Sequence, residues 1–279
     1  MKKILVTTDF SDHSKAGLQF AAQLASQNKY ALTFINVHHL QTPSAWDSVR
    51  MDQYQQEQKK QIMAQLVPFV EKIYEDLNIQ PVDIECVVEI SILPNACIIE
   101  YAEKHHYDYI CISTRGAGIM KRILGTITAN VINHSKVPVL VVPYDCQIFE
   151  IKSILYASDL DDYKNELGKV VSFAKPLNAD LELLHFISNP VAAEHWSTLE
   201  TQIKKITDYP VNIYIVEKKE NYNLLEAIEL QLKKMPFSPS LLVMFTGKTK
   251  NWFERTFYSG NSVEYAFQTQ VPLLIFNKL

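Results

Sequence analysis

Short apolar runs alternate with helix-like segments along the first half of the chain. Five runs rich in apolar residues are predicted as strands, at residues 4–7, 31–37, 82–88, 109–112 and 137–142. Between them, apolar side chains recur every three or four residues, which is typical of helices that cover a sheet. Because strands without polar alternation are buried on both faces, the pattern predicts a parallel sheet with helices on either side.

Two of the helical segments carry a residue that marks where a helix begins or is interrupted. Ser11 follows the first strand as a predicted N-cap, because its side chain can accept hydrogen bonds from the first helical N–H groups. The longest helical pattern runs from Asp47 to Leu77. Pro68 lies inside it and is predicted to kink or divide that helix, since proline has no N–H and its ring clashes with the preceding turn.

The second half of the chain repeats the order of the first. Lys3–Asp9 (KILVTTD) corresponds to Ser153–Asp159 (SILYASD), and Val137–Pro143 (VPVLVVP) corresponds to Val271–Phe276 (VPLLIF). Five further strands are predicted, at residues 154–157, 181–186, 211–216, 241–245 and 273–276, with a helix near residues 261–267. We therefore predict an α/β protein of two Rossmann-like, doubly wound domains, residues 1–146 and 147–279, related by internal duplication. Each is expected to hold a five-stranded parallel sheet flanked by helices.

Charge and composition narrow the classes of function. The chain has 279 residues, a net charge of −4 and 47% hydrophobic residues, as in ordinary globular proteins. The charge gives no electrostatic basis for binding nucleic acid or an anionic membrane. No apolar run approaches the ~20 residues of a membrane span. The apolar start stops at Thr7 without a cleavage site, so we expect a cytoplasmic protein with no nucleic-acid or membrane partner.

Metal binding and covalent catalysis find little support in the sequence. The cysteines at residues 86, 97, 111 and 146 form no C-x-x-C pair, and Cys111 is predicted as a small core residue. The pairs His38–His39 and His105–His106 have no evident third ligand, so we expect surface histidines. No G-x-S-x-G elbow is present in the sequence. We expect no metal site and no catalytic residue.

Three segments are expected to meet where the order of the strands reverses. Asp9 ends the first strand, Asn36–His38 ends the second, and the loop Ser113–Gly118 follows the fourth. Open parallel sheets bind ligands at this point, outside the carboxyl ends of their strands. Glycines let backbone N–H groups approach a phosphate, and Gly125–Thr126 opens the next helix, whose N-terminus favours an anion. The set suits a nucleotide, with Asp9 accepting hydrogen bonds from ribose.

Each of these features also has a plain structural reading. Glycines after a strand are commonly turn residues, and an aspartate at a strand end is commonly a helix cap. The basic side chains of the loop, Arg115, Lys121 and Arg122, would add positive charge near a phosphate. From the pattern alone, nucleotide binding and an ordinary loop both remain open.

Taken together, these segments resemble the universal stress protein family in its tandem-domain form. The opening Ile4–Ser11 (ILVTTDFS), the fourth strand and loop Asp108–Gly116 (DYICISTRG) and the closing strand Val137–Pro143 are similar to the family's. The resemblance extends over essentially the whole chain and is clearer in the first half. It implies a stress-response regulatory protein that binds ATP or another adenine nucleotide, with magnesium as companion ion. It implies no efficient catalysis, although slow ATP hydrolysis stays open.

The resemblance also implies which residues of the first domain bind the nucleotide. ATP-binding members carry a Gly-x2-Gly-x9-Gly-Ser/Thr loop. Here Ser113 replaces the first glycine, Gly116 holds the second, and Gly125–Thr126 closes a spacer one residue shorter. Asp9 corresponds to the family's adenosine-side aspartate, and Val37 to its adenine-contacting valine. The implied binding residues are Asp9, Val37, Ser113, Arg115, Gly116, Gly125 and Thr126.

The second domain departs further from that loop. Asp159 remains, but the segment after Phe245 carries the bulky side chains Trp252, Phe253 and Phe257. We predict a loop filled by its own side chains and no nucleotide there. Family members dimerise through the closing strand, so the two domains are expected to form an intramolecular pseudo-dimer, and a homodimer of whole chains stays open. The alternative function is a module that uses the same fold to bind a protein partner or another small molecule.

Overall fold

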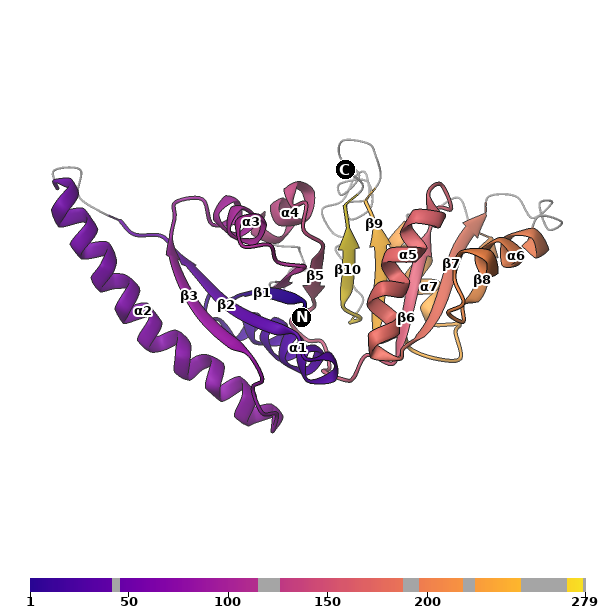
Figure 1. The fold of residues 1–279 in the computed structure, drawn as a ribbon, viewed down its shortest axis with the longest axis horizontal. Coiled ribbons are helices and arrows are strands. Elements are labelled where there is room, and N and C mark those ends of the chain that lie inside the picture. The colour runs from indigo at the N-terminus through magenta and orange to yellow at the C-terminus, as the bar shows by residue number, and fades with distance from the viewer. Residues whose placement is uncertain (42–45, 115–125, 188–195, 218–223, 247–269, 278–279) are drawn as a thin grey trace. The chain divides into compact units, whose positions relative to one another are not determined.

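The computed structural model describes residues 1–41, 46–114, 126–187, 196–217, 224–246 and 270–277. These residues divide into two compact units, residues 1–148 and residues 149–279 (Figure 1). Each unit is an α/β fold built on parallel strands, which confirms the predicted fold class. The helix predicted near residues 261–267 lies outside the described residues. No helix in the described ranges is long and apolar enough to cross a bilayer.

In the first unit, five strands alternate with four helices. The strands are β1 (Lys3–Thr7), β2 (Ala31–His38), β3 (Ile84–Ile90), β4 (Tyr109–Ser113) and β5 (Val139–Val142). The helices are α1 (Asp12–Asn28), α2 (Ser48–Leu77), α3 (Pro94–Lys104) and α4 (Thr126–His134). The strands are parallel and lie in the order β3-β2-β1-β4-β5.

The sheet of the first unit is covered on both faces, as the apolar strand patterns predict. Helices α1 and α2 lie on one face, and α3 and α4 lie on the other (Figure 1). In the central strand β1, Ile4, Leu5 and Val6 are all fully inaccessible to solvent. Because the chain moves outward from β1 to β3 and then returns to β4, the strand order reverses between β1 and β4. That reversal leaves a crevice at the carboxyl ends of these two strands.

Helix α2 is one continuous element of 30 residues, so Pro68 does not divide it, and the alternative of a kink stays a prediction. Pro68 is solvent-exposed, and its ring therefore faces no packed neighbour on the sheet side. The buried side chains of α2 lie from its middle onward, at Ile62, Leu66, Val70, Ile73 and Tyr74. Their spacing places one stripe of the helix against β3 and α1.

The second unit repeats this arrangement. Its strands are β6 (Ser153–Ser158), β7 (Asp180–Ile187), β8 (Asn212–Glu217), β9 (Leu241–Phe245) and β10 (Leu273–Phe276). Its helices are α5 (Tyr163–Ala174), the short 3-10 helix η1 (Lys175–Leu177), α6 (Trp196–Ile206) and α7 (Leu224–Leu232). The strands lie in the order β10-β9-β6-β7-β8. Strand β6 is central, as β1 is in the first unit, and each strand has the same neighbours as its counterpart there.

Candidate functional site

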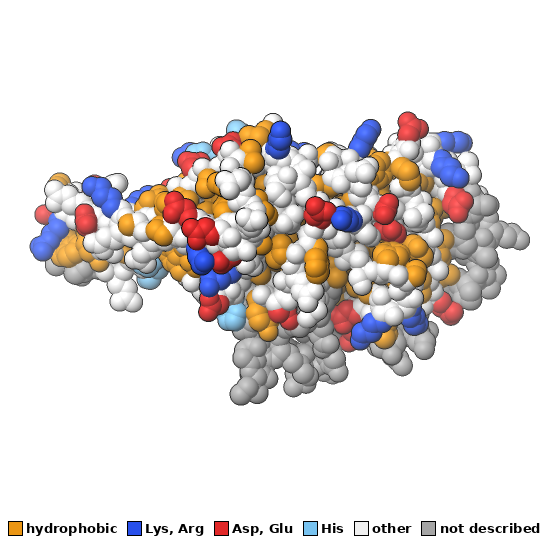
Figure 2. Space-filling view, turned by 90° about the horizontal axis from the view of Figure 1, so that it is seen from below, with side chains coloured by type: hydrophobic (Ala, Val, Ile, Leu, Met, Phe, Trp, Pro, Cys, Tyr) orange, Lys and Arg blue, Asp and Glu red, His pale blue; other side chains and the backbone are white. Residues whose placement is uncertain are grey.

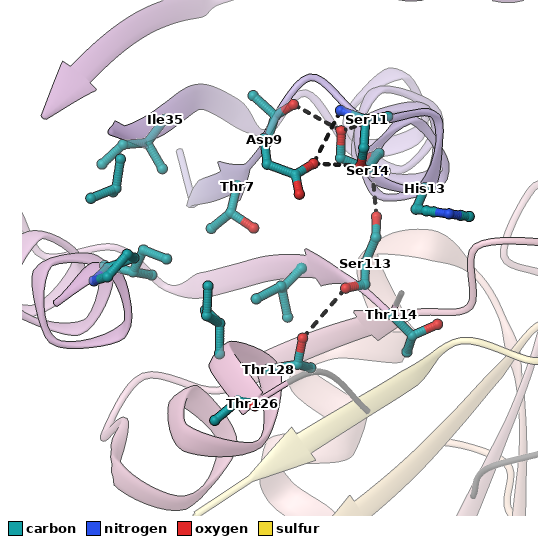
Figure 3. Close-up of a pocket in the computed structure, with 16 residues that line it drawn as sticks. Thr7, Asp9, Ser11, His13, Ser14, Ile35, Ser113, Thr114, Thr126 and Thr128 are labelled. Atoms are coloured by element: carbon teal, nitrogen blue, oxygen red, sulfur yellow. Dashed lines mark hydrogen bonds between the residues drawn. The ribbon is translucent and has the colours of Figure 1, made fainter. Parts of the chain in front are cut away.

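A pocket opens in the first unit at the carboxyl ends of β1, β2 and β4 (Figure 3). It lies where the strand order reverses, which is the place predicted from the sequence. Helices α1 and α4 begin at the same edge and contribute their first turns. The space that the centre of a water molecule can reach is about 150 Å³, which is room for roughly ten waters or a ligand fragment of similar size.

One end of the pocket is apolar. Ile35 and Val37 from β2 and Pro94 and Ile98 from α3 line it. Ile35 and Ile98 are almost fully buried, while Val37 and Pro94 are partly exposed to the pocket. Pro94 and Ile98 were not predicted as site residues, because only the packing of α3 against β2 brings them here. The proline at the start of a helix was the one available signal.

The other end of the pocket is polar. His13 comes from the first turn of α1, Thr114 directly follows β4, and Thr126 and Thr128 lie in the first turn of α4. Figure 3 places His13 and Thr114 on the side away from Ile35. The His13 ring meets the Tyr144 ring edge-on, with centroids 5.3 Å apart. This end therefore offers hydroxyl groups, an imidazole and a helix N-terminus, which are groups that hold anions.

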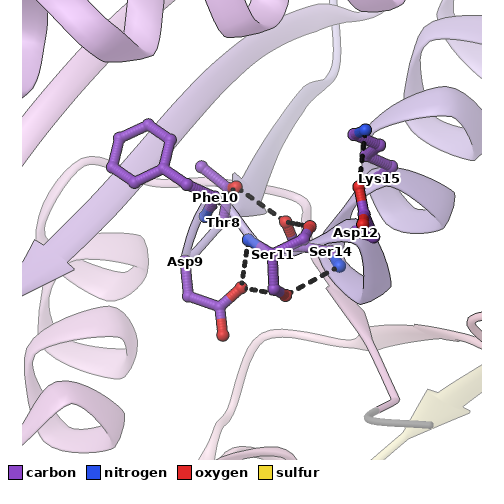
Figure 4. Close-up of polar contacts among 7 residues, drawn as sticks. All are labelled: Thr8, Asp9, Phe10, Ser11, Asp12, Ser14 and Lys15. Carbon is purple, nitrogen blue, oxygen red and sulfur yellow. Dashed lines mark hydrogen bonds and ion pairs between the residues drawn. The ribbon is translucent and has the colours of Figure 1, made fainter.

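Asp9 lies between these two ends and is fixed by a tight turn (Figures 3 and 4). Its Oδ1 accepts a hydrogen bond from the Ser11 N–H, at 3.1 Å, and another from the Ser11 hydroxyl. Ser11 is also the N-cap of α1, as predicted, because its side chain accepts from the Ser14 N–H at 3.3 Å. The carboxylate is thus held at the pocket by the first turn of the helix.

The same turn holds Phe10 in the left-handed region, at φ 63°. Bulky residues rarely adopt this conformation, which costs about 1–2 kcal/mol. The Phe10 N–H donates to Thr8 Oγ1 at 3.1 Å, and the Phe10 ring packs edge-on against Phe69 of α2 with centroids 5.6 Å apart. These contacts compensate the strained backbone and fix the position of Asp9.

The second unit contains the same turn. Leu160 has φ 65°, its N–H donates to Ser158 Oγ at 3.1 Å, and Asp159 Oδ1 accepts from the Asp161 N–H at 3.0 Å. The strained turn is therefore part of the duplicated fold. An aspartate in this turn has a structural role in both units, so it does not by itself identify a ligand site.

Ser113 lines the pocket, but its hydroxyl points toward α1. Ser113 Oγ accepts from the Gly17 N–H at 2.8 Å and donates to the Ser14 carbonyl at 3.0 Å. The backbone carbonyl of Ser113 accepts a hydrogen bond from Thr128 Oγ1 at 3.4 Å. The Ser113 hydroxyl therefore joins β4 to α1 and does not fill the pocket.

The remaining predicted residues divide between the pocket and the undescribed loop. Asp9, Val37 and Thr126 all line the pocket. Arg115, Gly116 and Gly125 lie outside the described residues, as do the basic side chains of Lys121 and Arg122.

In the second unit, aromatic side chains stand at the corresponding strand ends. Phe245 ends β9, the counterpart of β4, and stacks on Phe276 at the end of β10, with centroids 4.9 Å apart. Its ring also meets the Tyr156 ring edge-on at 5.8 Å. Phe245 thus takes the strand-end position that Ser113 has in the first unit. The glycines of the following loop lie outside the described residues.

Beneath these rings, the second unit buries a polar cluster that the first unit lacks. The Tyr156 hydroxyl donates to Glu166 and accepts from the Ser158 hydroxyl at 2.9 Å. Burial and the hydrogen bond to Glu166 raise the pKa of Tyr156 far above its usual value. Val6 and Ala16 occupy the matching positions of the first unit. The two units have therefore diverged in their cores as well as at the strand ends.

Metal and thiol chemistry do not fit the part of the chain that the structure describes. Within those ranges, no three His, Cys, Asp or Glu side chains are grouped to hold a metal ion. Cys111 is fully buried, as predicted, and burial raises its pKa well above the usual range. The half-buried Cys86 has its pKa raised to about 11, chiefly by burial. Neither thiol is activated as a nucleophile.

Comparison with known proteins agrees with this architecture. The model of the universal stress protein family matches residues 1–143, and no curated protein matches the chain. A universal stress protein from Archaeoglobus fulgidus DSM 4304 has a similar structure, with a TM-score of 0.73 and 20% identity over 99% of this chain and 98% of that one. A structure from Pseudomonas aeruginosa UCBPP-PA14 that carries the same family name has a TM-score of 0.62 and 13% identity, over 99% and 93%. The chain belongs to the universal stress protein family, in its tandem-domain form.

Proposed function

We propose that the first unit binds ATP or another adenine nucleotide in this pocket, and that binding serves a regulatory role in a stress response. The observation that carries the proposal is the change from apolar to hydroxyl-bearing side chains along the pocket. A nucleotide has the same polarity, with a flat base at one end and charged phosphates at the other. The proposed orientation places the base against Val37, the ribose at Asp9 and the phosphates at Thr126.

The apolar end suits a purine base. Val37 and Pro94 present partly exposed aliphatic surface, and Ile98 closes the wall behind them. A planar heterocycle placed here would bury both its own faces and these side chains, which is favourable at about 25 cal/mol per Å² of apolar surface.

Asp9 is placed to accept hydrogen bonds from ribose hydroxyls. A carboxylate has about four acceptor positions, so the two hydrogen bonds from Ser11 are compatible with a further one from a sugar. Because the turn already fixes the carboxylate, little entropy is lost when a ligand hydroxyl binds it.

The polar end suits the phosphates. The Thr126 hydroxyl and the N-terminus of α4 can donate to phosphate oxygens, while the Thr128 hydroxyl already donates to the Ser113 carbonyl. Among the described residues, no acidic cluster is placed to hold magnesium, so the ion would enter with the nucleotide. We expect the first unit to bind the nucleotide without hydrolysing it efficiently.

Ligand truncation combined with paired variants tests the proposed orientation. Val37→Lys is expected to weaken ATP and adenosine alike, by about tenfold or more, because it puts a charge against the base. Lys121→Gln with Arg122→Gln is expected to weaken ATP by about tenfold and leave adenosine unchanged, because it removes two positive charges that the sequence predicts near the phosphates. Titration calorimetry measures both affinities.

The matched control is Lys248→Gln with Lys250→Gln, which removes two charges from the corresponding loop of the second unit. It should leave both affinities unchanged. Equal losses for ATP and adenosine in the Lys121/Arg122 variant would contradict the orientation. Flat titrations of the wild-type protein would instead favour a module that binds a protein partner.

A further inference from the structure

The outer face of α2 carries a small apolar patch with opposite charges at its two ends. Met63, Ala64, Val67 and Pro68 line a shallow groove on this face, and Val67 is 39% exposed. Ala64, Val67 and Pro68 are exposed and lie outside the stripe that packs against the sheet, whereas Met63 is half-buried at the edge of that stripe. Figure 2 looks at this side of the first unit, where hydrophobic side chains lie among charged ones along α2, at left.

Lys60 and Glu71 lie at the two ends of this patch. Both are exposed and lie on the same stripe as Ala64 and Val67. The neighbouring Lys59 differs, because it turns to β3 and pairs with Glu89 at 2.8 Å. The side chains that directly flank the apolar centre therefore have opposite charges, Lys60 on one side and Glu71 on the other.

We infer that this face of α2 binds the same face of a second copy of the chain, with the two helices antiparallel. A two-fold axis at the centre of the patch brings Lys60 of one copy opposite Glu71 of the other, twice. The same axis sets Ala64 opposite Val67 and Met63 opposite Pro68. Surfaces that pair through a two-fold axis must be self-complementary, and this one is.

The opposite charges of Lys60 and Glu71 favour a second copy of the chain as the binding partner. A partner with one sign of charge would satisfy one end of the patch and repel the other, since the two ends have opposite signs. The small side chain of Ala64 near the centre lets two helix backbones approach closely. One helix pair buries less surface than a standard interface, so the dimer is expected to be weak and concentration-dependent.

Exchanging the charges tests the pairing directly. Sedimentation equilibrium of the full-length chain is expected to show a reversible dimer. Lys60→Glu places two acidic pairs across the axis and Glu71→Lys places two basic pairs, so each variant is expected to raise the dissociation constant by about tenfold or more. An equimolar mixture of the two variants restores opposite charges at both ends and should dimerise about as well as wild type.

The control variant is Lys104→Glu, an exposed charge reversal on α3, which should leave the dimer unchanged. Circular dichroism checks that each variant is folded, and ATP titration of the same samples should be unaffected, because the patch is separate from the pocket. A wild-type chain that is monomeric at high concentration would overturn the inference. So would single variants that still dimerise, or a mixture that stays monomeric.

Discussion

Replacing Gly17 with alanine is expected to lower the free energy of unfolding by about 2 kcal/mol. The added Cβ would stand 2.5 Å from Ser113 Oγ, which is shorter than any ordinary contact. The hydroxyl cannot rotate away without losing its hydrogen bonds to the Gly17 N–H and the Ser14 carbonyl. This loss outweighs the roughly 1 kcal/mol that alanine normally gains over glycine inside a helix. Urea unfolding measures the change.

The control is to measure the effect of Gly17→Ala on stability in a protein that also carries Ser113→Gly. The Ser113→Gly substitution removes the hydroxyl, and the next nearest atom to the added Cβ is the Ser113 backbone nitrogen at 3.4 Å. Gly17→Ala should therefore stabilise the Ser113→Gly protein by up to about 1 kcal/mol, as in an ordinary helix. A double-mutant cycle should give a coupling of about 3 kcal/mol. Simple additivity of the two substitutions would show that the hydroxyl does not hold α1 against β4.

Replacing Asp9 with alanine is expected to weaken ATP binding by at least about tenfold, because ribose hydroxyls lose a charged acceptor. Asp9→Asn keeps an oxygen that can accept from Ser11 and from a ribose, so its loss should be smaller. Titration calorimetry with ATP and magnesium measures both. The order wild type, asparagine, alanine is the expected result.

The duplicated turn supplies the control for this substitution. Asp159→Ala removes the equivalent carboxylate, whose Oδ1 accepts from the Asp161 N–H. It should cost about as much stability as Asp9→Ala, yet leave ATP affinity unchanged. An equal effect of the two substitutions on ATP binding would mean that Asp9 acts only through the structure of the turn.

The fold follows from the sequence because its signals are local. Apolar runs and helical periodicity indicate the alternation of strands and helices in both units, and β9 and β10 begin and end at the predicted residues. Ser11 was identifiable as an N-cap from its place before an apolar helical face. The predicted division of α2 at Pro68 is wrong because a long helix can tolerate an exposed proline when the flanking turns are well packed.

The site follows from the sequence only in part, because several of its contacts join distant segments. Asp9, Val37 and Thr126 could be placed from strand ends and a helix start. The direction of the Ser113 hydroxyl could not, since it depends on Gly17, which lies 96 positions earlier. Pro94 likewise enters the pocket only through the packing of α3 against β2. Such contacts have no periodic signature in the sequence.

Identifying the small molecule released from freshly purified, denatured protein tests the nucleotide proposal most directly. Mass spectrometry is expected to find ATP or another adenine nucleotide at close to one equivalent per chain. Protein purified without ligand should bind ATP and magnesium with the same stoichiometry in a calorimetric titration. Release of an unrelated metabolite would contradict the proposal, as would an empty protein that gives no heat with ATP.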